Sequence, residues 1–448
     1  MKQDLTTGPI GGVLLRFSLP MMLGNLLQQL YNVADTLIVG QFLGADALAA
    51  VGSAYTLMTF VTSILLGLCM GSGVVFSIRY GEKDEERLKS SLFVSFLFIG
   101  ICTLILNITV LVCIDPILYL LQVPAEVYPL MRRYLWIIFF GITATFLYNY
   151  FASLLRAIGN AVIPLVFLGG AALLNIGLDL LFVLGFRWGV EGAAAATVIA
   201  QFASGFGLAV YFLVHYPEWR IPRRCMRMRR EIVSEISRYS LLTCMQQSIM
   251  NFGILMVQGR INSFGPTVMA AFAAAVKIDS FAYMPVQDFG NAFSTFAAQN
   301  VGAHKPERIQ NGIKLAARMV LLFCLSISDL VVLGAKPLML LFVRPQETEV
   351  LAAGVEYLRI VGLFYCGIGW LFLLYGYYRA VKKPGLSVIL TILSLGTRVV
   401  LAYSLSAIPS VGVVGIWWAV PIGWLLADLI GYVYYRLHKK ELWDRIKS

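Results

Sequence analysis

The sequence predicts an all-α polytopic membrane protein with twelve transmembrane helices in two parallel six-helix bundles related by a pseudo-twofold axis. Three observations predict this fold class: the composition, the length of the apolar segments and an internal repeat. Hydrophobic residues make up 59% of the 448 positions and charged residues only 13%. Soluble domains carry about a quarter charged residues, so the composition excludes a water-soluble globular protein.

Twelve apolar segments are each long enough to cross a bilayer, which requires about 20 helical residues. Segments of this length exclude a membrane β-barrel, whose strands are short and alternate in polarity. In chain order, we expect the spans at 13–39, 47–78, 90–114, 127–155, 161–185, 189–215, 232–260, 266–299, 309–334, 350–378, 385–408 and 412–437.

The second half of the chain repeats the first. GADALAA at 44–50 resembles GPTVMAA at 265–271, a shift of 221 residues that later becomes 223. Because each repeat holds six spans, both halves enter the membrane in the same direction, which suits a transporter that opens to one side and then to the other. The clearest further matches pair Gly81 with Gly302, Glu86 with Glu307, Arg87 with Arg308, Tyr134 with Tyr357, Arg156 with Arg379 and Gly189 with Gly412.

The junction between the halves is a basic loop. We expect a first lobe at 1–215, a cytoplasmic linker at 216–230 containing WRIPRRCMRMRR, and a second lobe at 231–448 that ends in a short cytoplasmic tail. With a cytoplasmic N-terminus, most of the 35 lysines and arginines lie at cytoplasmic ends of spans, as the positive-inside rule requires. The net charge of +11 therefore indicates topology rather than a nucleic-acid partner, with an anionic-lipid site as the alternative. The expected location is the cytoplasmic membrane, with both termini in the cytoplasm.

Enzymatic chemistry finds no support in the sequence. The seven cysteines show no CxxC spacing, and the three histidines are scattered. Neither HExxH nor GxxxxGK[ST] occurs. We therefore expect no enzyme activity, no cofactor and no dedicated metal site.

Polar residues inside the spans point to function, because a membrane-embedded charge costs several kcal/mol unless it is paired, hydrated or protonated. Asp35 lies about five residues from the outer end of the first span, Asp179 about six from the outer end of the fifth, and Thr197 about eight into the sixth. At about 1.5 Å per residue, these three reach one level. Asn175 precedes Asp179 by four residues and shares its helical face.

Two carboxyl groups close together in a low-dielectric medium would not both ionise readily. One of them would hold an exchangeable proton, or Asp35 and Asp179 would share a bound cation such as Na⁺. The alternative is that both acids only hydrogen-bond polar neighbours and lock helices together. Gly67 and Gly71, spaced as GxxxG, indicate close helix packing.

The sequence resembles the MATE (multidrug and toxic compound extrusion) transporters over essentially its whole length. The resemblance rests on the order and spacing of SLP in the first span, YNVADTLIVGQFLGADALAA, QNVGAH after the eighth span, and NIGLDLLFVLGFRWGVEGAAAAT across the fifth and sixth. It implies the MATE fold, a monomer, and export of organic cations and other amphipathic compounds in exchange for H⁺ or Na⁺. Similarity to the DinF branch implies that the ion site of the first lobe consists of Asp35, Asn175, Asp179 and Thr197.

The first span also carries Pro20, which matches a family proline. The resemblance implies that this residue is a hinge. A proline inside a membrane helix also loosens the hydrogen-bond ladder on physical grounds.

The second lobe departs from the NorM branch, because LLTCMQQSIMNFGILM and VGLFYCGIGWLFLLYG in the seventh and tenth spans carry no acid. Instead, Lys277 and Asp279 lie about eleven to thirteen residues into the eighth span, at a depth where they can pair with Arg398 of the eleventh. Arg398 occupies the repeat position of Asn175. Two interpretations stay open: a structural ion-pair network, or a substrate contact that tolerates or prefers an anionic group. Asp288, further along the eighth span, is a candidate for binding a cation.

Flexible and aromatic side chains suit a cavity for varied amphipathic ligands. Packing in the core or against lipid explains such residues as well. The candidates are Tyr31, Tyr148 and Met256.

These observations predict a cation-coupled antiporter that exports organic cations and other amphipathic drugs by alternating access. An H⁺ or Na⁺ gradient drives it, and its partners are lipophilic small molecules and membrane lipids. The alternative is a flippase or exporter of a lipid-linked or anionic amphipathic metabolite. A non-transporting scaffold is the third class, and it predicts that removing the charge of Asp35 leaves function intact.

Overall fold

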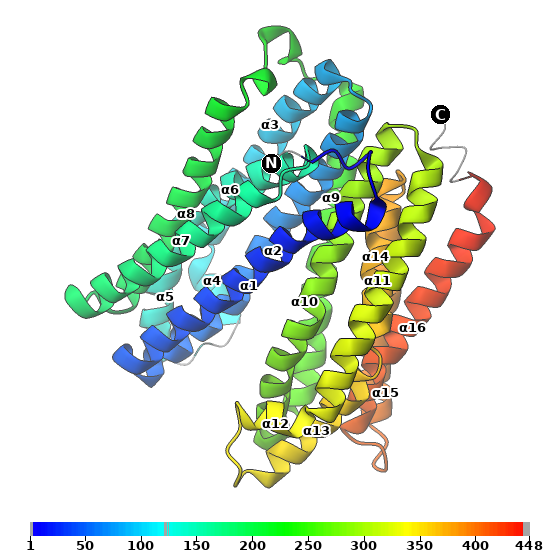
Figure 1. The fold of residues 1–448 in the computed structure, drawn as a ribbon. Helices are drawn as coiled ribbons and strands as arrows, with labels where there is room; N and C mark the ends of the chain where they lie inside the picture. The colour runs from blue at the N-terminus through cyan, green and yellow to red at the C-terminus, as the bar shows by residue number, and fades with distance from the viewer. Residues whose placement is uncertain (1–2, 121–122, 124, 442–448) are drawn as a thin grey trace. The chain divides into compact units, whose positions relative to one another are not determined.

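The chain is helical throughout the part that the computed structural model describes, which is residues 3–120, 123 and 125–441. No strand occurs in these residues, and eleven helices are long and apolar enough to cross a membrane. A twelfth span is formed by Thr348–Gly362 and Tyr365–Ala380, two helices that meet at a bend of 51°. The all-α membrane fold predicted from the sequence is confirmed (Figure 1). The end of the expected cytoplasmic tail, 442–448, lies outside the described residues.

Contacts divide the chain into two compact units. Unit 1 comprises Met1–Asp4 and Leu19–Cys244, and unit 2 comprises Leu5–Ser18 and Met245–Ser448. This division differs from the expected lobes at two places: it falls inside the seventh span rather than in the 216–230 linker, and it assigns residues 5–18 to the second unit. Two helices therefore run from one unit into the other, α1 (Ile10–Leu43) and α9 (Arg230–Asn262).

The same order of helices occurs twice along the chain. In unit 1 the helices that follow α1 are α2 (Ala45–Gly81), α3 (Glu85–Val112), α4 (Ile114–Leu120), α5 (Tyr128–Ile138), α6 (Ile142–Ala157), α7 (Val162–Asp179) and α8 (Gly189–His215). In unit 2 those that follow α9 are α10 (Pro266–Gly302), α11 (Pro306–Leu333), α12 (Ala335–Leu340), α13 (Thr348–Gly362), α14 (Tyr365–Ala380), α15 (Pro384–Ser406) and α16 (Val414–Leu437). The internal repeat in the sequence therefore reflects a repeat of structure.

The turns that precede α2 and α10 explain one of the repeated motifs. Gly44 and Gly265, which are 221 residues apart, have φ angles of 87° and 93°. Glycine adopts this left-handed region without the steric penalty of a Cβ atom. The GADALAA and GPTVMAA motifs thus begin with glycine because the backbone turns sharply there.

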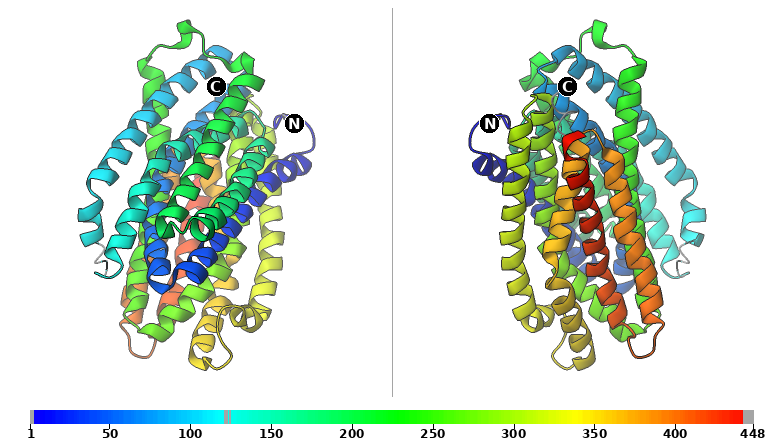
Figure 2. Two further views of the ribbon diagram at one scale, coloured as in Figure 1. Left: turned by 90° about the vertical axis from the view of Figure 1, so that its left-hand side faces the viewer. Right: turned by 90° about the vertical axis from the view of Figure 1, so that its right-hand side faces the viewer.

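One helix lies at the centre of each unit. In unit 1, α6 packs against α2, α3 and α8, and its buried side chains include Tyr150 and Phe151. In unit 2, α14 occupies the equivalent place against α10, α11, α15 and α16, and most of its residues are buried. The right-hand view of Figure 2 shows the neighbouring pair α15 and α16, in orange and red.

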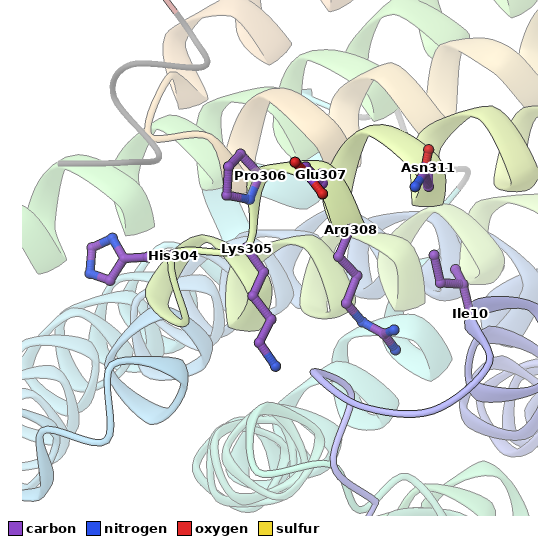
Figure 3. A pocket seen from close by; sticks show the side chains of 7 residues that line it. All are labelled: Ile10, His304, Lys305, Pro306, Glu307, Arg308 and Asn311. Carbon is purple, nitrogen blue, oxygen red and sulfur yellow. The ribbon is translucent and has the colours of Figure 1, made fainter.

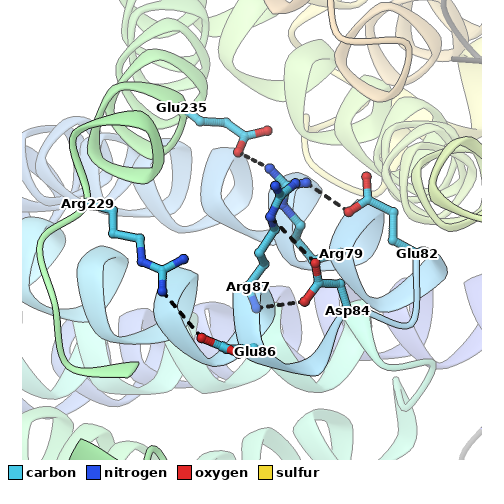
Figure 4. A network of polar contacts seen from close by, with 7 residues as sticks. All are labelled: Arg79, Glu82, Asp84, Glu86, Arg87, Arg229 and Glu235. Carbon is cyan, nitrogen blue, oxygen red and sulfur yellow. Dashed lines mark hydrogen bonds and ion pairs between the residues drawn. The ribbon is translucent and has the colours of Figure 1, made fainter. Parts of the chain in front are cut away.

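Ion pairs hold the start of α9 against the turn between α2 and α3 (Figure 4). Arg79 of α2 pairs with Glu235 of α9 and, at 2.8 Å, with Glu82. Arg229, the residue before α9, contacts Glu86 of α3 at 3.3 Å. These contacts lie within unit 1 and hold the end of the basic linker and the start of α9 against α2 and α3.

The corresponding turn of unit 2, between α10 and α11, holds the segment that leads into α1. Arg308 donates hydrogen bonds to the backbone carbonyls of Thr7 (2.6 Å) and Gly8 (2.8 Å), and Lys305 donates to that of Thr6 (2.8 Å). A pocket of about 520 Å³ lies beside these side chains (Figure 3). Arg87, the repeat mate of Arg308, pairs instead with Asp84 of its own turn, so the two turns hold these segments with different residues.

Candidate acid-pair site and family

The central feature of unit 1 is a pair of buried carboxyl groups. Asp35 on α1 is 9% exposed and Asp179, the last residue of α7, is fully buried. The two side chains lie close enough to interact with each other electrostatically. Two carboxyl groups this close in apolar surroundings do not both ionise readily, so the geometry suits a pair that shares one proton.

Asn175 and Thr197 complete the site on the α7 side. We orient the Asn175 amide so that each of its atoms faces a group of opposite role. Its nitrogen then donates to Asp179 Oδ2 at 3.2 Å, and its oxygen accepts from the hydroxyl and the backbone N–H of Thr197, both at 3.3 Å. The structure therefore brings together all four residues that the sequence analysis assigned to the ion site.

The local sequence explains how these groups meet. Asn175 and Asp179 are one helical turn apart on α7, and α7 packs along α8, which carries Thr197. Directly after Asp179 the helix widens into a π-helical turn over Leu180–Gly185. Such turns are rare and occur frequently at functional sites.

Two tyrosines lie close enough to the acid pair to interact with it electrostatically. They are Tyr31, one turn before Asp35 on α1, and Tyr134 on α5. Tyr31 was predicted to line a substrate cavity, whereas Tyr134 was not assigned to any site. Its repeat mate Tyr357 also lies beside a buried acid, a likeness that only the structure reveals.

Unit 2 contains a second buried acid with tyrosine neighbours. The Tyr357 hydroxyl of α13 donates to Asp279 Oδ2 of α10 at 3.1 Å, and both side chains are buried. Tyr365 and Arg398 interact electrostatically with the same carboxyl group. The Arg398 Nε is buried and has no hydrogen-bond partner among the described residues.

Lys277 does not join this cluster. It is exposed, and the described residues provide no ion pair between it and Asp279 or Arg398. The expectation that all three could pair is therefore wrong for Lys277. The reason is helical geometry: residues two apart on a helix point in different directions, so Lys277 shares the depth of Asp279 but not its face of the helix.

The other predicted residues have separate surroundings. The Tyr148 hydroxyl donates to the Pro164 carbonyl at 3.1 Å and so connects α6 to α7. Met256 is largely exposed on α9, and Asp288 is buried on α10. Pro20 lies inside α1, which continues through it.

The acid pair offers oxygen ligands rather than a metal site of the usual kind. Within the described chain, no group of three or more His, Cys, Asp or Glu side chains could hold a metal ion. The pair can exchange a proton, and its carboxyl oxygens together with Thr197 and Asn175 suit an alkali cation, because hard cations prefer oxygen. Either ion would remove the repulsion between two carboxylates.

Comparisons with known proteins agree with the geometry. The MatE family model matches residues 20–181 and 239–404. The probable multidrug resistance protein YpnP of Bacillus subtilis (strain 168) is 30% identical over 436 residues, which cover 97% of this chain and 96% of that protein. The FAD transporter of Shewanella oneidensis is 26% identical, with 96% and 95% covered.

A solved structure of a MOP superfamily transporter from Pyrococcus furiosus has the same fold. It matches with a TM-score of 0.92 at 24% sequence identity, and the match covers 98% of both chains. The family model covers most of the sequence, and the relatives align from end to end. The chain therefore belongs to the MATE family of membrane transporters.

Proposed function

We propose that the chain is a cation-coupled antiporter that exports lipophilic, often cationic compounds, and that the acid pair binds the coupling ion. The observation that supports this most is the closeness of the Asp35 and Asp179 carboxyl groups in apolar surroundings. Ionisable groups inside a membrane cost free energy and usually mark an ion pathway, so the pair is best explained by binding and release of an ion. Relatives named as multidrug resistance proteins support export of drugs.

The proton is the coupling ion that this geometry favours. One proton shared by Asp35 and Asp179 leaves a single negative charge, which the Asn175 amide and nearby hydroxyl groups can stabilise. In the proposed alternating-access cycle, the pair takes up a proton from the outer side and drug affinity falls. The ion can drive export only because it binds the two conformations with different affinity. Pro20 is the proposed point at which α1 bends between them.

We further propose that the protein resides in the cytoplasmic membrane with both termini in the cytoplasm. An even number of spans places both termini on one side. The basic segment 219–230 then lies in the cytoplasm, as the positive-inside rule favours.

A vesicle assay tests this proposal. Purified protein in liposomes is expected to move an ethidium-like dye when a pH gradient is imposed, and Asp35→Asn and Asp179→Asn each abolish this movement. Asp329→Asn is the matched control, because Asp329 is also an acid near the end of a membrane helix but is exposed. The assay is repeated with a Na⁺ gradient at equal pH. Dye movement with the Na⁺ gradient alone would show that Na⁺, and not the proton, is the coupling ion. No movement under either gradient would refute the antiport proposal.

Arg398 favours a second candidate function, export of an anionic amphipathic metabolite or flipping of a lipid with an anionic headgroup. A buried guanidinium nitrogen without an acceptor is a ready partner for a carboxylate or phosphate. The similarity to an FAD transporter supports the same class of substrate. This candidate predicts transport of a flavin nucleotide that Arg398→Gln abolishes while dye export persists.

A further inference from the structure

Unit 2 contains a buried acid that the proposed ion site does not use. Asp428 of α16 is 8% exposed, and neither of its carboxyl oxygens has a hydrogen-bond partner in the described part of the chain. By contrast, Asp179 bonds to Asn175 and Asp279 bonds to Tyr357. The structure therefore gives Asp428 no contact that would explain it as a helix-locking residue.

The internal repeat shows that helix packing does not require this acid. At the shift of 223 residues, Asp428 corresponds to Gly205 of α8, and Gly367 of α14 corresponds to Ala144 of α6. In unit 1 a Cβ atom at Gly205 would collide with the Ala144 carbonyl, so the two helices touch through small residues. In unit 2 a Cβ atom at Gly367 would lie 3.7 Å from Asp428 Oδ2. Where unit 1 has the packing glycine Gly205, unit 2 has Asp428, and Gly367 on the facing helix leaves room for the Asp428 side chain.

Among the described residues, no positive charge is paired with Asp428 to stabilise an ionised carboxylate. Tyr375 interacts with it electrostatically, but Arg379 bonds to Asn291 and Arg398 interacts with Asp279. The charged or titratable groups that the neighbouring helices bring to α16 include Tyr375, Tyr377 and Tyr378 on α14, Arg398 on α15, Lys383 at the start of α15 and Tyr357 on α13. Lys383 donates to the Tyr434 hydroxyl and to Glu441 instead. An ionised Asp428 would therefore be an unpaired charge among apolar helices, which is strongly unfavourable in free energy.

We propose that Asp428 is a second proton-binding site, located in unit 2 and distinct from the acid pair. In the conformation described here it is a neutral carboxylic acid. When another conformation admits water, its O–H bond breaks, the proton passes to water and a hydrated carboxylate remains; uptake reverses these steps. Asp428 lies nine residues before the end of α16, about 14 Å along the helix. Its part in transport rests on the antiport proposed above.

Infrared difference spectroscopy on the purified full-length protein tests the site without any substrate. The spectrum of the unsubstituted protein minus that of Asp428→Asn is expected to contain one carbonyl stretch of a protonated, weakly hydrogen-bonded carboxylic acid at neutral pH. This band is expected to vanish reversibly as the pH rises, while circular dichroism shows that the helices persist. Asp329→Asn removes no such band. If Asp428→Asn does not fold, Asp428→Ala serves the same subtraction.

Two results would overturn the inference. A missing band at neutral pH would mean that Asp428 is ionised, and a band that persists at every pH would mean a permanently neutral acid. In vesicles, the Asp428→Asn protein is expected to take up one proton fewer than the unsubstituted protein for each dye molecule that it exports. A titrating band in a protein that moves no dye would refute the proposed antiport but leave the proton site in place.

Discussion

At the scale of single residues, uncharged donors hold two of the buried acids. Asp179 uses the Asn175 amide, and Asp279 uses the Tyr357 hydroxyl. Amides and hydroxyls hold a carboxyl group without fixing its charge, because they can face either its neutral or its ionised form. A lysine or arginine salt bridge would instead keep the acid ionised.

The sequence revealed the acid pair but not its tyrosines. Asp35, Asn175, Asp179 and Thr197 could be predicted because polar groups stand out in apolar spans and depth follows from residue number. Tyr134 could not, because a tyrosine in an apolar helix fits packing equally well. The estimated depth also predicted a wrong partner for Lys277, because depth specifies a level in the membrane and not a face of the helix.

Removing the hydroxyl of Tyr357 tests the cluster in unit 2. Tyr357→Phe leaves a buried oxygen of Asp279 without its donor, which should lower the free energy of unfolding by about 1–3 kcal/mol. Thermal melting of the purified protein measures the effect. Tyr403→Phe is the control, since that exposed hydroxyl bonds weakly to the Met256 carbonyl at 3.4 Å. Equal melting temperatures for the two variants would mean that the Tyr357 bond contributes nothing.

Asp115, on the short helix α4 outside the spans, gives a pH prediction. Hydrogen bonds from Arg132 (2.6 Å) and then Tyr128 (2.7 Å) lower the pKa of its carboxyl group. A lowered pKa in the folded state means that the contact stabilises above the unfolded pKa and is lost as the pH falls. Asp115→Asn should therefore reduce the melting temperature at neutral pH and have no effect in acid. A difference that persists in acid would contradict this assignment.

At the scale of elements, hydropathy predicted the spans well but not their continuity. Most ends of the long helices lie within a few residues of the expected positions, because lipid exposure requires long apolar runs. The short helices α4 and α12 and the bend between α13 and α14 were missed. Hydropathy indicates which segments lie in lipid, but a segment has the same hydropathy whether its helix is straight or broken.

The GxxxG pair in α2 was predicted to serve close helix packing, and the structure confirms the contact. A Cβ atom at Gly67 or Gly71 would collide with the backbone of α9 at Cys244 or Tyr239, within unit 1. Gly71→Ala should destabilise the protein by about 1–3 kcal/mol or block folding, because backbone cannot give way as a side chain can. Gly52→Ala in the same helix meets nothing within 4 Å and should melt normally. A stable Gly71→Ala protein would contradict the packing.

The segment before α1 depends on Arg308 of α11. Arg308→Ala removes its donors to the Thr7 and Gly8 carbonyls, which should loosen residues 5–8 by about 1 kcal/mol and speed their hydrogen exchange about fivefold. Mass-spectrometric exchange measures this rate. Arg318→Ala, an exposed arginine on the same helix, is the control. Unchanged exchange in Arg308→Ala would show that the remaining bonds suffice, which are those from Leu5 N–H to Gln299, from Asn300 to the Leu5 carbonyl and from Lys305 to the Thr6 carbonyl.

At the scale of the whole molecule, two repeats share a fold and differ in their polar groups. Unit 1 carries the acid pair, and the repeat positions of Asp35, Asn175 and Asp179 in unit 2 are Met256, Arg398 and Ala402. Duplication therefore preserved the scaffold while the ionisable residues diverged. This divergence supports the proposal that the acid pair of unit 1 binds the coupling ion.

The central claim is that export of substrate is obligatorily coupled to import of protons through Asp35 and Asp179. The most direct measurement loads purified-protein vesicles with dye and reports the internal pH with a trapped indicator, without any imposed pH gradient. Outflow of dye is predicted to draw protons in and acidify the interior, and Asp35→Asn is predicted to abolish the acidification. Dye outflow through the unsubstituted protein with no change in internal pH would contradict the account.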